Sequence, residues 1–456
     1  MQRQSCFVLA VFSMILALTG GMTRAAEQTA WKAGLAKAKI TPDKPMWMSG
    51  YGPRLAKEKL HDIWIKVLAV EAADGHRAVV ITSDVCGFSK VAYEAICAEL
   101  KKRCGLERAQ IMLTCSHTHT GPALRECLHV CWPWNDEQAR ALVEEYSLWL
   151  EKTIVEKVAE ALAQMTPATL WATEGMTDFA VNRRNNPEGE VTAIRQRGEA
   201  LKGPVDHSIP ILAVRAPDGG LRAAVFGYAC HTTTLASLEW SGDYAGFAML
   251  ALQQKHPEMQ AMFYQGCGAD QNPLPRRSVE LCQKYGQMLA DGVADALAKP
   301  MRPLASRLAT VFDFVDLAYE RNLTDAELQS QSQSSTVLGL IAKRYLEQLA
   351  AGPLPKTYPY PIQVWKLGQD QLWISMGGEV AVDYSLKFKA RYGPQTWVAG
   401  FTHDLMCYIP TLRIQKEAFG QETGALWAYA LPAHDWSRDV EDRVTQGVER
   451  LVEKVR

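Results

Sequence analysis

The sequence predicts an α/β fold in which mixed β-sheets are flanked by helices within a single large domain. Apolar runs at 64–70 and 78–82 indicate strands. A helix follows, because apolar residues recur at three- and four-residue spacing over 92–100 and Gly105 ends the pattern. Another short apolar strand comes next, at 110–114. This strand–helix–strand order is typical of a β-α-β unit.

The rest of the chain continues the alternation of strands and helices. Apolar residues at every fourth position from Leu142 to Leu162 predict a long helix that Pro167 ends. We interpret 317–352 as a polar helical insert with a break at 330–335, and 353–361 as a proline-rich linker. The same patterns predict strands at 209–214, 223–228, 261–264, 362–367, 371–376 and 397–401, and helices at 244–254, 281–297 and 440–455. No repeat or second domain boundary interrupts this order.

Composition and charge are those of a globular protein without a preference for polyanions. Hydrophobic residues make up 48% of the chain and charged residues 22%. The 49 basic and 50 acidic residues give a net charge of −1. We therefore expect neither nucleic acid nor an anionic membrane surface as a partner. The sequence indicates no oligomeric state.

Residues 1–26 have the pattern of a signal peptide. Arg3 supplies a positive start, 7–18 form a short apolar core, and 23–26 include small residues for cleavage. An uncleaved anchor is the alternative, but the apolar core is short for a bilayer span, and no later stretch is long and apolar enough. The sequence predicts an exported protein, periplasmic or secreted, whose mature domain spans 27–456 without a transmembrane segment.

The string C-S-H-T-H-T-G-P at 115–122 stands at the centre of this organisation. It directly follows the strand predicted at 110–114, and its final Gly-Pro breaks regular structure. We therefore expect His117 and His119 where a core strand becomes a loop, on extended backbone that points both imidazoles to one side. One imidazole can bind a metal while the other reaches a substrate or water. Two histidines hydrogen-bonded within a turn is the alternative.

Other strand ends carry further groups that can bind a metal. His231 follows the strand at 223–228, and Glu379 and Tyr408 follow later strands. Two imidazoles and a carboxylate are the ligand set of a catalytic zinc that leaves one position open for water. Zinc would lower the pKa of that water and polarise a carbonyl group. Four more residues could orient the ligands or accept protons: Asp84, Asp243, Asp270 and His403. Each of them is also common at helix caps or in turns.

The cysteines leave two interpretations open. Of the eleven in the chain, all but Cys6 belong to the expected mature domain, and export permits disulfides. Cys127 and Cys131 bracket His129. We interpret this group as a loop disulfide or as unpaired thiols rather than as a second metal cluster.

In these strings and in their order, the chain resembles the catalytic domain of the neutral/alkaline non-lysosomal ceramidase family from about residue 36 onward. The resemblance is carried by I-T-P at 40–42 with G-Y-G at 50–52, Asp84, S-H-T-H-T-G-P at 116–122, Asn182-Arg183, C-H-T-T at 230–233, G-A-D at 268–270 with Pro273, Gly378-Glu379 and the segment at Tyr408. It implies a zinc amidase that cleaves the N-acyl bond of a sphingoid lipid. The zinc ligands that it implies are His117, His231, Glu379 and Tyr408. It also implies that His119 lies near the reacting group and that Arg183 contacts the substrate.

Two departures separate the chain from the family pattern. The family has a serine in a G-D-x-S-P string, whereas this chain reads A-D-Q-N-P at 269–273, with Asn272 in place of the serine. A serine mechanism therefore does not carry over. Metal-activated water with His119 as proton shuttle remains, and Asp270 and Asn272 are candidate site residues. The sequence after Tyr408 also lacks the family's second substrate tyrosine and its C-terminal β-sandwich domain, which argues against long-chain ceramide as substrate.

Three functions are consistent with these residues. The first is an exported zinc-dependent hydrolase of an amide (N-acyl) bond, acting on a small-molecule or lipid-like N-acyl substrate. The second is a metal-dependent esterase or phosphoesterase in which Arg183 or Arg184 faces an anion. The third, favoured by Asn272, is a binding protein that retains the metal without turnover.

Overall fold

A nine-stranded mixed sheet forms the centre of the protein, in the order β13–β11–β10–β8–β1–β5–β6–β7 with β15 beside β8. The computed structural model describes residues 31–417, 423 and 425–456, so the expected signal peptide lies outside the described residues. The strands of this sheet are β1 (Trp31–Lys39), β5 (Trp64–Glu71), β6 (Arg77–Ser83), β7 (Ile111–Cys115), β8 (Thr166–Met176), β10 (Ser208–Arg215), β11 (Leu221–Tyr228), β13 (Gln260–Gln265) and β15 (Arg302–Leu304).

A four-stranded sheet packs against one face of the nine-stranded sheet. Its strands, in spatial order, are β16 (Leu308–Ala318), β17 (Thr357–Leu367), β18 (Gln371–Met376) and β20 (Trp397–Ala399). Large aromatic side chains fill the interface, since the rings of Trp373 and Tyr264 lie 5.2 Å apart and those of Trp373 and Trp397 lie 5.3 Å apart. Such rings bury much apolar area, so this interface is a major source of stability.

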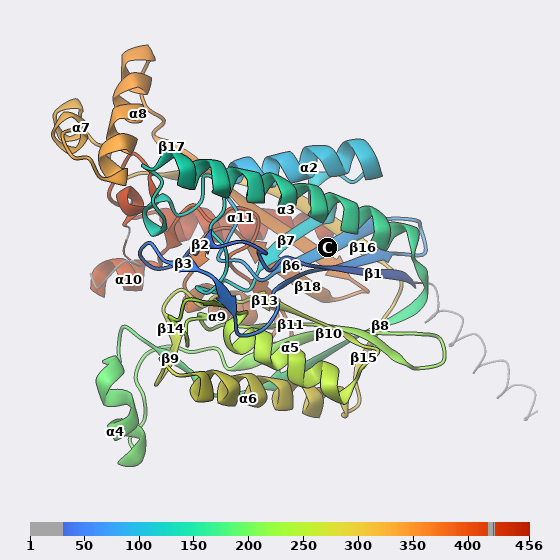
Figure 1. Ribbon diagram of the computed structural model, residues 1–456. Coiled ribbons are helices and arrows are strands. Elements are labelled where there is room, and N and C mark those ends of the chain that lie inside the picture. Colours follow the sequence, from blue (N-terminus) through green and yellow to red (C-terminus); the bar gives the residue numbers. More distant parts are fainter. Residues whose placement is uncertain (1–30, 418–422, 424) are drawn as a thin grey trace, which may run out of the picture.

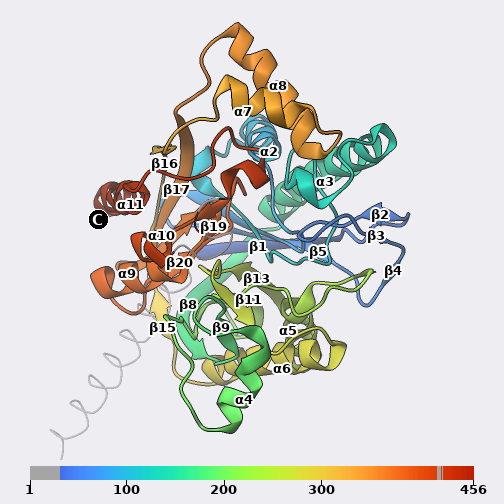
Figure 2. The same cartoon turned by 90° about the vertical axis from the view of Figure 1, so that its left-hand side faces the viewer.

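Helices cover the outer faces of both sheets (Figures 1 and 2). In β5, Ile65 and Val67 face one helical layer while Leu68 and Val70 face the other sheet, as the two-residue period of a strand requires. The protein therefore has four layers, helix, sheet, sheet and helix. The covering helices are α2 (Lys90–Cys104) and α3 (Glu137–Ala163) over β1 and β5–β7, α5 (Asp243–Lys255) and α6 (Val279–Leu297) over β10, β11 and β13, and α9 (Val382–Tyr392) and α11 (Val440–Val455) on the four-stranded sheet.

Shorter elements join these layers. The short strands are β2 (Met46–Trp47), β3 (Leu55–Ala56), β4 (Glu58–Lys59), β9 (Ala180–Asn182), β12 (Glu239–Trp240), β14 (Gln271–Pro273), β19 (Glu379–Val380) and β21 (Tyr408–Ile409), and the other helices are α4 (Val191–Gln196), α7 (Asp325–Ser332), α8 (Val337–Ala351) and α10 (Leu412–Glu417). None of the helices in the described part of the chain has the length and apolar character needed to cross a bilayer.

The expected α/β class with mixed sheets flanked by helices is confirmed. Strands β6 and β7 pair in parallel and are joined through α2, and β11 and β13 pair in parallel and are joined through α5. Local signals set the helix ends: Ser89 accepts a hydrogen bond from the Ala92 amide at the start of α2, and Gly105 ends it with a φ of +67°.

The segment 353–361 differs from the expected linker, because β17 begins at Thr357 and includes Pro359 and Pro361. Proline lacks the amide hydrogen that a central strand needs. Within the described residues, pairing of β17 with β18 begins only at Ile362, so the prolines occupy a part of β17 that pairs with β16 alone. The preceding segment contains the end of β16 at Ala318 and then α7 and α8, which project from the body of the protein (Figure 1).

Sequence patterns missed β1, β8 and β16. Strand β1 lies between β5 and β8 in the nine-stranded sheet, but it is rich in alanine, glycine and lysine rather than in β-branched residues. Its small side chains have a packing reason, because α3 crosses close above it. A Cβ atom added at Gly34 would lie 1.8 Å from the carbonyl oxygen of Ala161 in α3.

We expect Gly34→Ala to destabilise the protein by about 3 kcal/mol, because the clashing group is helix backbone and neither element can move without disturbing the core. Urea unfolding followed by circular dichroism would measure the change. Gly189→Ala is the matched control, since no atom lies within 4 Å of the added Cβ. A Gly34→Ala variant as stable as the control variant would contradict the close contact of β1 and α3.

Candidate metal centre

Three side chains from distant parts of the chain meet beyond the ends of β7 and β11. His117 follows β7, His231 follows β11, and Glu379 begins β19. The Oε2 atom of Glu379 lies 3.2 Å from Nε2 of His231 and 3.7 Å from Nε2 of His117. One potential ligand atom from each residue lies within 4.8 Å of the others, and all three side chains are buried. The structure thus brings together three of the four residues expected to hold a metal.

Hydrogen bonds on the far side of each ring fix the tautomers of the two histidines. Nδ1 of His117 lies 2.6 Å from the carbonyl oxygen of Cys86, and Nδ1 of His231 lies 2.6 Å from that of Gly268. A carbonyl oxygen only accepts, so each Nδ1 carries the hydrogen. Each Nε2 then carries a lone pair on the side of the ring that faces the site, where Glu379 lies. The hydrogen bonds from Nδ1 to backbone carbonyl oxygens orient the two rings, as such bonds do for histidine ligands of zinc.

The charges of the three groups match this geometry. Burial favours a higher pKa for Glu379, but His117, His231 and the hydroxyl of Tyr429 outweigh it and lower the pKa to about 2. Burial lowers the pKa of His231 to about 3, with Arg183 adding to the effect, and burial also lowers the pKa of His117. At neutral pH the carboxylate is ionised and both imidazoles are neutral, which is the state that binds a metal.

These residues fit a divalent cation of the zinc type. The Nε2 lone pairs of His117 and His231 lie close to the buried carboxylate of Glu379, and none of these three groups has a hydrogen to donate to the others. This arrangement is repulsive unless a positive charge lies between the groups. Two nitrogens and one oxygen are also the ligand types of catalytic zinc sites. A second group of potential ligands, Cys86, His117 and His119, adjoins the first and shares His117 with it.

His119 lies against His117, with 3.1 Å between their Nε2 atoms. The expectation of extended backbone here is wrong, because His117 has a φ of +57°. This left-handed residue turns the chain so that the two rings meet edge to face, 4.8 Å between centroids. The ring of Tyr51 packs on His119 at 4.5 Å, and Arg54 donates a hydrogen bond to the His119 carbonyl oxygen. His119 is therefore held beside the candidate metal ligands.

Tyr408 and Arg183 form one hydrogen-bonded unit beside Glu379. Strands β19 and β21 pair in parallel with Glu379 opposite Tyr408. Nη2 of Arg183 donates to the Tyr408 hydroxyl at 3.0 Å and to the carbonyl oxygen of Ala269 at 2.7 Å. Nη1 donates to Oδ1 of Asn272 at 3.2 Å. Asn272 thus contacts the site through Arg183.

Asp270 is fully buried and does not line the cavity. Its carboxylate accepts hydrogen bonds from the Val382 amide at 3.0 Å, Nδ2 of Asn182 at 3.0 Å and Nη2 of Arg413 at 3.1 Å. It therefore connects the segment that leads into β14, the strand that carries Asn272, to the start of α9, and its catalytic role stays a prediction.

The other polar residues singled out in the sequence also lie outside the cavity lining. Asp84 accepts from the Trp64 amide, and Nε2 of His403 lies 3.2 Å from the hydroxyl of Ser375. Asp243 accepts from the amides of Thr234 and Leu235, and thereby joins the segment after His231 to the start of α5.

A cavity of about 440 Å³ opens onto the candidate metal ligands. It includes groups to which the sequence assigned no role, among them Tyr51 of the G-Y-G string, Arg276 and Tyr429. No second site tyrosine was expected after Tyr408, yet Tyr429 donates to Oε1 of Glu379 at 2.5 Å. It comes from a short 3-10 helix at Leu426–Tyr429, which has no periodic pattern. The residues that line this cavity are Gly50, Tyr51, Gly52, His117, His119, Leu128, Val130, Cys131, Arg183, Thr233, Arg276, Glu379, Tyr408, Ala428 and Tyr429.

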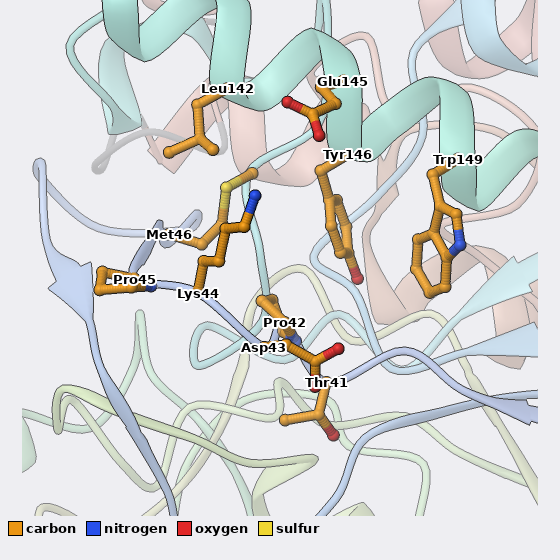
Figure 3. Close-up of a pocket in the computed structure, with 10 residues that line it drawn as sticks. All are labelled: Thr41, Pro42, Asp43, Lys44, Pro45, Met46, Leu142, Glu145, Tyr146 and Trp149. Carbon is orange, nitrogen blue, oxygen red and sulfur yellow. The ribbon is translucent and has the colours of Figure 1, made fainter.

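A second cavity, of about 230 Å³, lies between residues 41–46 and α3 (Figure 3). Tyr146 and Trp149 extend from α3 toward the chain at 41–46. The hydroxyl of Tyr146 donates a hydrogen bond to the carbonyl oxygen of Ile40. This second cavity shares no lining residue with the first cavity and holds none of the candidate ligands.

Cys127 and Cys131, like the other described cysteines, are unpaired thiols.

Comparison with known proteins places the fold. No protein-family model matches the chain, and no curated protein sequence matches it. Among solved structures it is similar to a neutral ceramidase from Pseudomonas aeruginosa, with a TM-score of 0.67 at 18% identity over 93% of this chain and 75% of that one. A structure described as a ceramidase complexed with C2 gives a TM-score of 0.65 at 18% identity over 93% of this chain and 76% of that one. The chain therefore has a ceramidase-like fold.

Proposed function

We propose that the protein is a zinc-dependent hydrolase of an amide (N-acyl) bond, with a ceramidase-like site. The observation that carries this proposal is the buried convergence of His117, His231 and Glu379 at the wall of a cavity. These three residues would hold the zinc, with Tyr408 as a further ligand. A bound zinc would lower the pKa of a water molecule and polarise the substrate carbonyl. From the N-terminal sequence alone, we also propose export.

The residues around the cation have separate roles in this proposal. His119 would take the proton from the attacking water and give it to the leaving amine, since its Nε2 lies beside His117. Burial lowers the pKa of His119, so the ring is neutral before it accepts that proton. Arg183, fixed by Asn272 and the Ala269 carbonyl, would orient the substrate. Tyr429 would hold Glu379 through its hydrogen bond to Oε1.

Metal analysis and a substrate panel test the proposal. We expect about one zinc per purified chain, the number for a single catalytic site. Amide, carboxyl-ester and phosphate-ester substrates with the same acyl or alkyl group would then be compared. Preference for the ester or the phosphate would favour the alternative hydrolase classes, and zinc without turnover of any substrate would favour a binding protein.

We expect Gly50→Ala to reduce kcat by about 100-fold while the protein stays folded. Gly50 has a φ of +89°, and a Cβ atom there would lie 2.3 Å from the ring of His119. The added methyl group would displace the ring of His119 from its position beside His117. Loss of a proton-transfer group lowers the rate of the catalysed step by about 10²- to 10⁴-fold. Steady-state kinetics and zinc content would be measured together. An unchanged kcat in a variant that keeps its zinc would contradict the role given to His119.

A further inference from the structure

Two arginines line the cavity and a third contacts Tyr51 of its lining, and we refer to Arg183, Arg276 and Arg277 as the arginine rim. Arg183 and Arg276 line the cavity directly. Arg277 donates from Nη1 to the hydroxyl of Tyr51 at 2.8 Å, and its guanidinium lies 5.1 Å from the centre of that ring. Tyr51 in turn packs on His119, so the rim begins next to the proposed reaction centre.

The described lining of the cavity contains two guanidinium groups and one carboxylate. Among the described residues that line the cavity, Glu379 is the sole carboxylate, and the proposed zinc would more than neutralise it. Glu188 pairs with Arg276 through two hydrogen bonds of 2.8 Å, but its side chain is 44% exposed. The pKa of Glu188 is lowered first by that hydrogen bond to Arg276, and also by the charges of Arg276, Arg277 and Arg183. All three guanidinium groups therefore lie close enough to Glu188 to favour its charged form.

Apolar side chains also line the cavity. Leu128, Val130 and Ala428 offer no hydrogen-bonding side chain there. An acyl chain would gain from contact with these residues. A cavity lined by guanidinium groups, by apolar side chains and by the proposed reaction centre fits a substrate that has both an apolar group and an anion near its scissile bond.

We infer that the substrate is an N-acyl amino acid, in which the amide to be cleaved carries a carboxylate on its amine side. This inference rests on the proposed amide hydrolase. A guanidinium group pairs with a carboxylate through two parallel hydrogen bonds, which an uncharged amine cannot reproduce. Glu188 already binds Arg276 in this way, so the position of that guanidinium is suited to a carboxylate. Hydrolysis would add water across the C–N bond and release a carboxylic acid and a free amino acid.

Binding of two matched ligands tests the inference. N-octanoylglycine carries the carboxylate, and N-octanoylglycinamide has the same acyl chain and a neutral carboxamide in its place. We expect calorimetry with the zinc-loaded protein to give at least about tenfold tighter binding of the carboxylate, an advantage that should shrink as ionic strength rises. The ratio of kcat/KM for the two compounds should show the same preference.

Variants of the rim make the test specific. The double variant Arg276→Gln/Arg277→Gln should bring the ratio of the two dissociation constants close to one, whereas Arg276→Lys, which keeps the charge, should retain part of the preference. Arg197→Gln is the matched control, because Arg197 also pairs with a surface carboxylate, Glu199, but does not line the cavity.

Equal binding of the two ligands by the wild-type protein, or a preference that survives the double variant, would overturn the inference. Failure of the proposed function gives a different result. If the carboxylate binds more tightly through the rim but neither compound is hydrolysed, the inference on the ligand stands and the amide hydrolase does not. If both compounds are hydrolysed without preference, the hydrolase stands and the inference falls.

Discussion

Replacement of His117 by alanine should remove the zinc and reduce amide hydrolysis by on the order of 10³-fold. Loss of a residue that merely orients a ligand already costs about 10- to 100-fold in metal affinity or activity, and loss of a direct ligand costs more. His117 also contacts His119, so its removal would disturb the proposed metal site and the proton-transfer group together. Few other single changes would affect both.

Zinc content by mass spectrometry and initial rates would be measured on the same preparation of this variant. His76→Ala is the matched control, because the ring of His76 forms a hydrogen bond with the hydroxyl of Thr310 and does not line the cavity. The control should keep its zinc and its rate. Full activity of His117→Ala would end the proposal of a metal-dependent hydrolase that uses this site.

The sequence could predict that His117, His231 and Glu379 approach the site because each stands a few residues after a predicted strand. Strand ends are the part of an α/β fold where buried backbone gives way to loops, so metal-binding side chains there are informative. The resemblance to ceramidases supplied the order in which His117, His231 and Glu379 should combine. The short distances between the potential ligand atoms of these three residues depend on how the two sheets pack. No local sequence pattern encodes that packing.

Residues that do not closely follow a predicted strand could not be predicted in the same way. Tyr429 reaches Glu379 from a short 3-10 helix, and Arg276 and Arg277 follow a proline in an irregular loop. Their positions result from contacts with residues far away in the chain, such as that of Arg277 with Tyr51. The left-handed backbone of His117 was missed because histidine seldom adopts it, so the sequence favoured an extended conformation.

Glu379→Gln should abolish the stabilisation of the protein by zinc while leaving the metal-free protein folded. Glutamine has nearly the same shape as glutamate, and its Oε1 can still accept from the Tyr429 hydroxyl. Its Nε2 can donate to Nε2 of His231, which lies 3.2 Å from the replaced oxygen. The repulsion between lone pairs would then become a hydrogen bond, so the variant would satisfy the buried site without a cation.

Thermal unfolding with zinc and with a chelator distinguishes the two proteins. At free zinc about 1,000 times the dissociation constant, binding should stabilise the wild-type protein by roughly 4 kcal/mol and raise its Tm. The Tm of Glu379→Gln should respond little to zinc and, with chelator present, should equal or exceed that of the wild-type protein. Glu188→Gln, which removes a carboxylate outside the ligand group, should keep the wild-type response to zinc. A Glu379→Gln protein that zinc stabilises as strongly as the wild type would show that the cation binds elsewhere, because the negative charge of this carboxylate would then contribute nothing to the binding.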